Sequence, residues 1–370
     1  MNSLKLPLTE QKIIELSNIK EEPNCIKTLR LKSLEEFLES TNAIFGPDIK
    51  LNFNKLNYND EIIRFVNDDN DLKSKKVIHC DITTSLNLHQ ELFLKHFNNL
   101  IKYNENRYTT LNTAIYNNGS FIYIPKNTKL EKPLNNYIKN NQFERTIIIV
   151  DEGSEIEYIE HSLNEDIIHS NIVEIYVNKK SKCKYITIQN NSKNTHEISL
   201  KRAYVENDAT MDWVNINLGS KINMCYPTSI LKGDKAKSTS NSFSISNKLQ
   251  TQDTGAKMIH IGRKTTSVIN STMMSLNGGS GSVRINANIK KEAHDSESNI
   301  KVKVLLLDND SKCDVVPKNK TENELSNIKQ ETLVIKQSKK EAIADIVKGI
   351  SDILSSECKE IILPLLKDLK

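Results

Sequence analysis

From residue 111 to residue 317, apolar and polar positions alternate in short runs, a pattern typical of β-strands. Short polar turns separate these runs at a nearly constant interval. When the small residue or threonine that follows each turn is aligned, successive positions lie 26 to 29 residues apart. The aligned positions are Thr128, Ser154, Ser181, Ala209, Ala236, Thr265 and Ala293. This self-similarity indicates stacked repeats, in which each unit buries its apolar face only against its neighbours.

These repeats predict a mainly β fold. Each unit holds two or three short strands and no helix-length apolar stripe, which favours a β-helix (β-solenoid) over a helical solenoid or an irregular sandwich. We therefore expect a solenoid core over residues 111–324. Its rungs should contain about 27 residues each, with the aligned turn residues in one column.

The N-terminal region, 1–110, shows helical spacing between polar stretches. Apolar residues recur from Leu29 to Leu38 and from Leu88 to Leu100, and these two runs predict amphipathic helices that pack against the core. The charged segment 67–76 between them predicts a loop.

The C-terminal region, 325–370, returns to helical spacing. Apolar residues repeat from Ile343 to Leu354 and from Ile361 to Leu366, which predicts a pair of helices. Two roles fit such helices equally well. They could cap the end of the solenoid, where strand edges are exposed, or they could form a docking surface for a partner.

Composition and charge narrow the class of protein. The chain of 370 residues is 37% apolar, enough for a large core, and its net charge of +4 gives no strong field for nucleic acid. No apolar run is long enough to span a membrane and no signal-peptide pattern is present, so we expect an unexported protein without membrane insertion.

The use of cysteine and of basic residues points to a compartment. The six cysteines lie far apart without a CxxC pair, which favours a reducing environment over a disulfide framework or a zinc ribbon. Lysine greatly outnumbers arginine, and asparagine and isoleucine are abundant. This usage suggests an AT-rich genome, such as that of an organelle or an endosymbiont.

Several long motifs in a fixed order carry a family resemblance. They are LNTAIYNNGSFIYIPKNTKLEKPL (111–134), QFERTIIIVDEGSEIEYIE (142–160), YITIQN (185–190), DTGAKMIHIG (253–262) and LLLDNDSKCDVVP (305–317). With these motifs the chain resembles the SufB/SufD family of iron-sulfur cluster assembly proteins. The motifs QFERTIIIVDEG and DTGAKMIHIG are closer to the SufB branch, and EEPNCIKTLRLKSLEEF (21–37) matches the family more loosely.

The resemblance implies a right-handed parallel β-helix with helical ends that works as an assembly scaffold. Such a scaffold receives sulfur from a cysteine desulfurase and SufE-type donor, receives iron, and builds a transient iron-sulfur cluster. The implied partners are a SufC-like ATPase and a SufD-like subunit or a second copy of the chain, and the resemblance leaves open a flavin in the complex. Because plastid genomes commonly keep a gene of this family, we expect the stroma of an apicoplast-like plastid, with a bacterial or endosymbiont cytoplasm as the alternative.

The candidate cluster ligands lie near the end of the predicted solenoid. Thiolates hold iron-sulfur clusters, and the acceptor cysteine that the resemblance implies falls at Ser311. Cys313 lies two residues on, an offset that keeps the same face of a strand. The family's His-Glu-Ala-Thr run is matched by QETL, in which Gln330 replaces histidine and Glu331 keeps the carboxylate. We expect Cys313 and Glu331 to bind the metal of the cluster, with an ordinary buried cysteine as the alternative.

A second candidate group concerns the entry of sulfur. The run YPTSIL matches the family's YPSCIL, so Ser229 stands where the resemblance implies the receiving cysteine. Cys225 lies four residues earlier, on the same strand face if no bulge intervenes. Arg202 matches a family TKR run, and a cation beside a sulfur path would favour the thiolate or persulfide anion. The alternatives are a packing role for Cys225 and a solvated or salt-bridged Arg202.

Functions other than a scaffold fit the sequence less well. The chain has no GxxxxGK[ST] loop and is expected to be no enzyme and no ATPase. The substitutions at Ser311 and Gln330 make a cluster-less structural subunit that only binds the SufC ATPase the main alternative. A β-helix enzyme acting on carbohydrate is remote, because one tryptophan and 6% aromatic residues supply few platforms for sugar rings.

Overall fold

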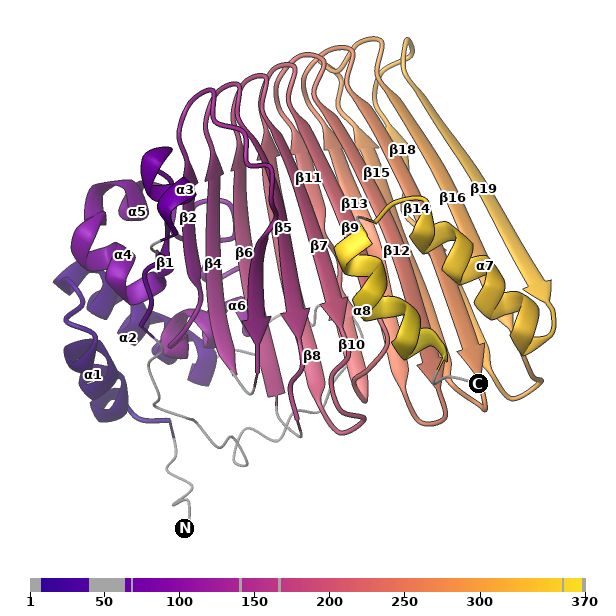
Figure 1. The fold of residues 1–370 in the computed structure, drawn as a ribbon, viewed down its shortest axis with the longest axis horizontal. Coiled ribbons are helices and arrows are strands. Elements are labelled where there is room, and N and C mark those ends of the chain that lie inside the picture. The colour runs from indigo at the N-terminus through magenta and orange to yellow at the C-terminus, as the bar shows by residue number, and fades with distance from the viewer. Residues whose placement is uncertain are drawn as a thin grey trace.

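The computed structural model describes residues 8–39, 64–67, 69–139, 142–165, 168–354 and 356–367. Helices lie at both ends of the chain and strands fill the middle (Figure 1). The strands form two facing sheets whose side chains meet in shared apolar clusters, as Ile122 and Ile156 do. The mainly β, parallel solenoid predicted from the repeats is therefore confirmed.

Each turn of the chain adds strand segments to both sheets, and every pairing of named strands is parallel except that of β1 with β2. Sheet A has eleven strands: β1 (Ile78–Asp81), β2 (Ser120–Ile124), β4 (Phe143–Val150), β6 (Ile168–Val177), β8 (His196–Val205), β10 (Ile222–Cys225), β11 (Thr228–Leu231), β13 (Thr251–His260), β15 (Ser280–Ile289), β17 (Lys312–Pro317) and β18 (Lys320–Thr321). Sheet B has eight: β3 (Leu134–Ile138), β5 (Glu155–Ser162), β7 (Lys182–Gln189), β9 (Thr210–Asn217), β12 (Lys237–Asn247), β14 (Thr266–Leu276), β16 (Glu297–Leu306) and β19 (Asn327–Lys336).

The predicted column of turn residues exists, with one correction. Before the six strands β5, β7, β9, β12, β14 and β16 of sheet B, the directly preceding residue is buried and the residue before that one adopts a positive φ, as Gly153, Lys180 and Lys264 do. The column runs through Ser154, Ser181, Ala209, Ala236 and Thr265 as expected, but Ala293 is not its next member. Ser296 takes that place, because the turn before β16 (290–296) is two residues longer than the turn before β14 (261–265), and the positive φ moves to Asp295.

The N-terminal region packs its helices against the first strands of sheet A. Its helices are α1 (Glu10–Ile19), α2 (Asn24–Glu39), α3 (Asn70–Ser74), α4 (Ile82–Leu88), α5 (Gln90–His96) and α6 (Arg107–Ile115). The helix predicted over Leu29 to Leu38 is confirmed within α2. The one predicted over Leu88 to Leu100 is confirmed only as α5, because Leu88 ends α4 and the chain turns after His96. Phe37 and Phe93 are buried in one cluster with Phe121 of β2. The segment 67–76, expected to be a loop, instead contains the short helix α3. Strand β4 is buried along its whole length because these helices cover its outer face.

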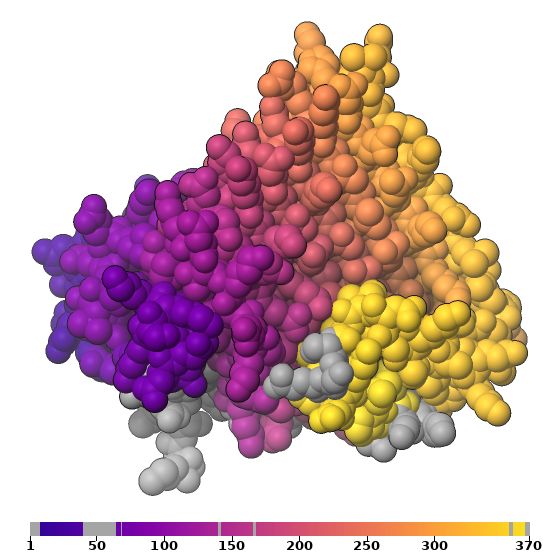
Figure 2. Space-filling view, turned by 45° about the horizontal axis from the view of Figure 1, so that its top comes forward, coloured from indigo at the N-terminus to yellow at the C-terminus, as the bar shows by residue number. Residues whose placement is uncertain are grey.

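The C-terminal helices do not cap the solenoid. Helices α7 (Lys339–Ser351) and α8 (Ser356–Lys367) fold back over the outer face of sheet B, where they form the yellow layer in Figures 1 and 2. Ile346 and Ile362 are buried there against residues such as Ile216. Before them, β19 continues the solenoid to residue 336, past the boundary expected at 324.

Candidate functional site

The interior of the solenoid is the first candidate site, because it holds charged groups in its central rungs. Side chains on a strand point alternately to opposite faces, so every second residue of β8 faces inward. Lys201 faces inward and is fully buried. We call the buried charged group of these rungs the interior cluster; its members are Glu144, Glu160, His169, Glu197 and Lys201.

Lys201 forms a buried ion pair with Glu160. Its Nζ lies 2.7 Å from Glu160 Oε1 and donates a second hydrogen bond of 2.6 Å to Thr187 Oγ1. The Glu160 carboxylate also accepts hydrogen bonds from Tyr185 and from Asn171 Nδ2. Burial raises the pKa of Glu160, but Lys201 and these donors outweigh it and the net pKa is lowered. Glu160 is therefore an ionised carboxylate inside the protein.

His169 links two further carboxylates of the interior cluster. Its Nδ1 lies 2.6 Å from Glu197 Oε2 and its Nε2 lies 3.3 Å from Glu144 Oε2. Burial lowers the pKa of His169, but Glu197 and Glu144 outweigh that effect and raise it to about 10. A protonated imidazole that donates from both nitrogens fits this geometry.

Cys225 lies beside the interior cluster. The strand register pairs it with Ser199 and Thr254, and it pairs Ser229 with Ala203, so both Cys225 and Ser229 face the interior as expected from their spacing. Cys225 is 3% exposed, and its Sγ lies 3.7 Å from Asn215 Oδ1. Burial raises its pKa to about 11, an effect that the charge of Lys201 partly opposes. The isolated chain therefore keeps this thiol protonated at neutral pH.

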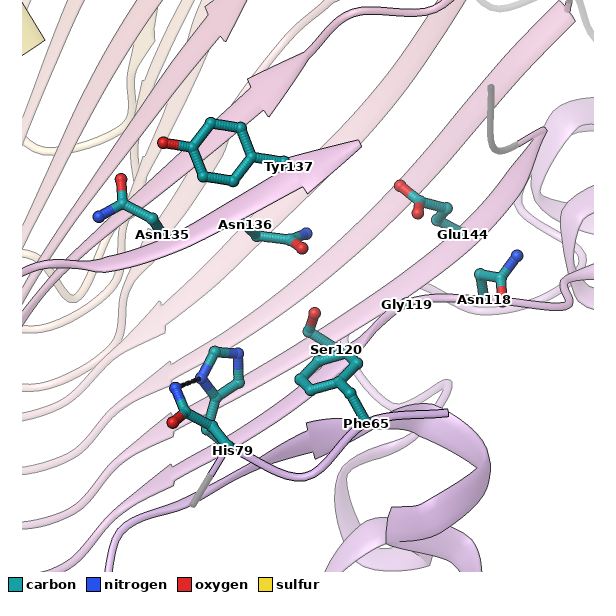
Figure 3. Close-up of a pocket in the computed structure, with 10 residues that line it drawn as sticks. Phe65, His79, Asn118, Gly119, Ser120, Asn135, Asn136, Tyr137 and Glu144 are labelled. Atoms are coloured by element: carbon teal, nitrogen blue, oxygen red, sulfur yellow. Dashed lines mark hydrogen bonds between the residues drawn. The ribbon is translucent and has the colours of Figure 1, made fainter. Parts of the chain in front are cut away.

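A pocket of about 350 Å³ leads toward the interior cluster from the N-terminal end of the solenoid (Figure 3). Asn135, Asn136 and Tyr137 of β3 line one side, and His79 lines the other. His79 contacts Asn67 through Nδ1, while its buried Nε2 has no hydrogen-bond partner in the described part of the chain. Burial lowers its pKa to about 4, so it is neutral. Glu144 lines this pocket as well and thus connects it to His169.

Arg202 is not at the place expected for it. It lies on the outer face of β8, where its guanidinium forms a bidentate ion pair with Glu105 at 2.7 and 2.8 Å and donates to the Leu100 carbonyl at 2.6 Å. Arg202 thus anchors the N-terminal region to sheet A, as the salt-bridge alternative anticipated. The cation that lies near Cys225 is its neighbour Lys201, and strand alternation in the KR pair was the signal that could have identified it.

Cys313 lies at the C-terminal end of the solenoid and faces inward. It pairs with Gly281, and a Cβ at Gly281 would lie 3.2 Å from Cys313 Sγ and 2.8 Å from Met273 Cγ. Burial raises the pKa of this half-buried thiol to about 12, with a further contribution from Asp314. Ser311 occupies the acceptor position that the resemblance implies. It lies in the turn before β17, where its hydroxyl donates a hydrogen bond to Asp308 Oδ2.

The structure does not bring Glu331 to Cys313. Glu331 lies on β19 in the other sheet and pairs with exposed Lys301, so its side chain faces the outside of the solenoid. The expectation that Cys313 and Glu331 bind one metal is therefore wrong for the isolated chain, because Cys313 faces the interior and Glu331 faces the outside. Among the described residues no group of three or more histidine, cysteine, aspartate or glutamate side chains could hold a metal ion.

The fold and this interior define a class, the parallel β-solenoids with a charged interior and helical ends. Comparison with known families assigns the chain to one family. Residues 134–341 match the SUF system FeS cluster assembly, SufBD core domain, and residues 47–135 match the SufBD protein N-terminal region. The chain belongs to the SufBD family of iron-sulfur cluster assembly proteins.

Curated relatives agree with this assignment. An iron-sulfur cluster assembly SufBD family protein of Staphylococcus aureus is 34% identical over 397 residues, which covers 93% of this chain and 85% of the relative. A SufBD family protein of Staphylococcus saprophyticus is 34% identical with the same coverage. In the described part of the chain, no helix is both long and apolar enough to cross a membrane.

Proposed function

We propose that this chain is a SufB-like scaffold subunit of a SUF assembly complex, which accepts sulfur and iron and builds a nascent iron-sulfur cluster as its cargo. The observation that carries this proposal is the place of Cys313. It is a thiol at the end of the solenoid where β17 and β19 are the last strands of their sheets. A cluster bound there by the thiolate would be within reach of a second subunit that supplies the remaining ligands.

In this proposal, the first sulfur acceptor lies in the interior of the solenoid. The terminal sulfur of a donor persulfide passes to the Cys225 thiol, which becomes a persulfide while the donor thiol is regenerated. The positive charge of Lys201 favours the anionic form of the persulfide, the role first expected of Arg202. A desulfurase and SufE-type donor would supply the sulfur, and a SufC-like ATPase would supply the energy of ATP hydrolysis.

Anaerobic reconstitution with ferrous iron and sulfide tests the proposal, because a bound cluster gives charge-transfer absorption in the visible range. The cluster-less structural subunit remains the second candidate, favoured by the separation of Glu331 from Cys313. If reconstitution gives no visible band, either with the chain alone or with its SufD-like partner present, the result would support the cluster-less alternative.

The free edge of β19 is the proposed contact with a SufD-like subunit or a second copy. Its residues from 329 to 334 are exposed, including Leu333 at 48% and Val334 at 59%. An unpaired edge strand is a template for pairing with another chain. The backbone N–H of Asn327 donates to the carbonyl of Ser296, the residue before β16, so by alternation the N–H of Thr332 points to the free edge.

Thr332→Pro is therefore expected to weaken subunit association about tenfold or more while keeping the solenoid folded, since proline removes a free-edge donor. Light scattering after size exclusion measures association of the chain with itself, and co-purification measures association with a SufD-like subunit. Thr332→Val is the matched control and keeps the backbone donor. Association unchanged in Thr332→Pro would contradict edge pairing.

The SufC-like ATPase is proposed to dock on α7 and α8. The apolar stripe of these helices is not available for docking, because it is buried against sheet B. Docking must use the outer side of the helices, where Ala344 and Lys348 are exposed. A variant with Ala344→Arg and Lys348→Glu should lose co-purification with the ATPase but keep its thermal stability, because exposed substitutions change stability little. Lys193→Glu, on an exposed turn, is the control, and retention of the ATPase by the double variant would contradict docking at this surface.

The compartment is proposed to be a plastid stroma, supported by the dominance of lysine over arginine and by the abundance of asparagine and isoleucine. The curated relatives named above are bacterial. A bacterial or endosymbiont cytoplasm is the alternative.

A further inference from the structure

A second pocket, of about 490 Å³, lies on the outer face of sheet A, between the N-terminal segment 101–106 and the end of β17. A row of side chains crosses its floor on adjacent strands. By strand register the row runs through Arg202, Thr228, Lys257, Asn286 and Lys318, all of which line the pocket. Adjacent strands lie about 4.8 Å apart, so the three cations stand on alternate strands, roughly 10 Å from one another.

A glycine lets two strands approach closely under this floor. In the row next to the cations, Gly255 lies between Tyr226 and Arg284, which line the pocket. A Cβ at Gly255 would lie 1.8 Å from the Arg284 carbonyl oxygen, so no other residue fits there without a shift of the backbone. The strands beneath the pocket therefore depend on a glycine of the DTGAKMIHIG motif.

The charges around the pocket do not balance. Arg202 is paired with Glu105, and Arg284 is paired with Asp253 through two contacts of 2.8 Å. Lys257 and Lys318 make no hydrogen bond or ion pair through their ammonium groups to any residue that the structure describes. Two positive charges within one pocket therefore lack a described ion-pair or hydrogen-bond partner, and Glu105, already paired with Arg202, only partly offsets that of Lys257.

Lys257 is half-buried, which is unusual for a lysine without an ion-pair partner in the described part of the chain. Burial lowers its pKa, and the charge of Arg202 lowers it further. Removing an ammonium from water without a partner costs free energy, so such a group is an acceptor site for an anion. An anion bound here would compensate Lys257 and Lys318 together.

We propose that this pocket binds a small molecule that carries a phosphate monoester. A phosphate monoester carries about two negative charges at neutral pH, which matches the charge of the two lysines. The Asn286 amide adds a hydrogen-bond donor in the same row. Ile101, Leu200 and Tyr226 line the pocket beside the cations and offer apolar contacts for the organic part of the ligand. This binding site is independent of Cys313 and of cluster assembly.

Calorimetric titration of the full chain with phenyl phosphate tests the proposal. The wild-type chain should bind phenyl phosphate saturably, more tightly than benzenesulfonate, which has a similar shape but one charge, and more tightly than inorganic phosphate, which lacks the ring. The double variant Lys257→Ala, Lys318→Ala should bind phenyl phosphate about tenfold more weakly or worse, since hydrogen bonds to charged groups are strong. The control Lys301→Ala, Lys329→Ala removes two exposed lysines from sheet B and should bind like the wild type.

Three results would overturn the site: no saturable binding by the wild-type chain, equal affinity for benzenesulfonate, or equal affinity in the two double variants. If inorganic phosphate binds as tightly as phenyl phosphate, the proposal of an ester ligand is overturned and the pocket is a site for free phosphate. Far-UV circular dichroism confirms that each variant is folded. Cluster reconstitution is measured on the same variants, so failure of the phosphate site is distinguishable from failure of the scaffold proposal.

Discussion

Cys313→Ser is expected to abolish the visible absorption of the reconstituted cluster. Iron in such clusters is held by thiolates, and a serine hydroxyl is a hard, weakly acidic ligand of similar volume. Because burial raises the pKa of Cys313 to about 12, iron has to displace the thiol proton, and cluster uptake should become more complete as pH rises. Absorption spectra after anaerobic reconstitution, with iron and sulfide analyses, measure the loss.

The controls for this prediction come from the other cysteines and from Glu331. Cys25 is exposed, and Cys358 is buried against sheet B, so serine at either position should leave the absorption unchanged. Glu331→Gln should also leave it unchanged, because Glu331 faces the outside of the solenoid. Full absorption in Cys313→Ser would refute the assignment, and loss in Glu331→Gln would show that the free chain rearranges around iron.

Lys201→Met is expected to destabilise the fold by about 3–5 kcal/mol, because it leaves the buried carboxylate of Glu160 without its partner. The side chains of Lys201 and Glu160 are 0% and 3% exposed, so water cannot replace the lost cation. Urea denaturation at neutral pH measures the change in the free energy of unfolding.

A double variant separates charge from packing. Adding Glu160→Gln to Lys201→Met removes the stranded charge and should recover a large part of the lost stability, as replacement of both members of a buried pair often does. Lys232→Met, on an exposed turn, is the matched control and should change stability by no more than about 0.5 kcal/mol. A stability of Lys201→Met equal to that of the control would show that Glu160 is not a buried anion.

The architecture was predictable because its turns recur at a regular interval with similar residues. In the turns before β5 to β16 of sheet B, a residue at positive φ is followed by a small buried one, as in Gly153 and Ser154, Lys180 and Ser181, or Lys264 and Thr265. The prediction failed at Ala293 because an insertion in a turn changes the spacing without changing the turn's composition.

The sites were less predictable, because spacing tells which residues share a face but not which face is inside. Cys225 and Ser229 were correctly assigned to one face, whereas Arg202 was placed beside the sulfur path although Lys201 faces inward. The position of Glu331 depended on β19 continuing the solenoid, which an exposed and weakly apolar strand does not reveal. The interior cluster was missed because its members are 57 residues apart in sequence at the extremes, Glu144 and Lys201, and meet only through stacking.

The two ends of sheet A are unlike, and this difference bears on how two chains could associate. At its start, β1 runs antiparallel to β2 and continues directly into α4. At its finish, β17 has a neighbour on one side only. Two chains that associate through the edges at this finish would each use that edge in the one contact, so association of this kind would close at a pair.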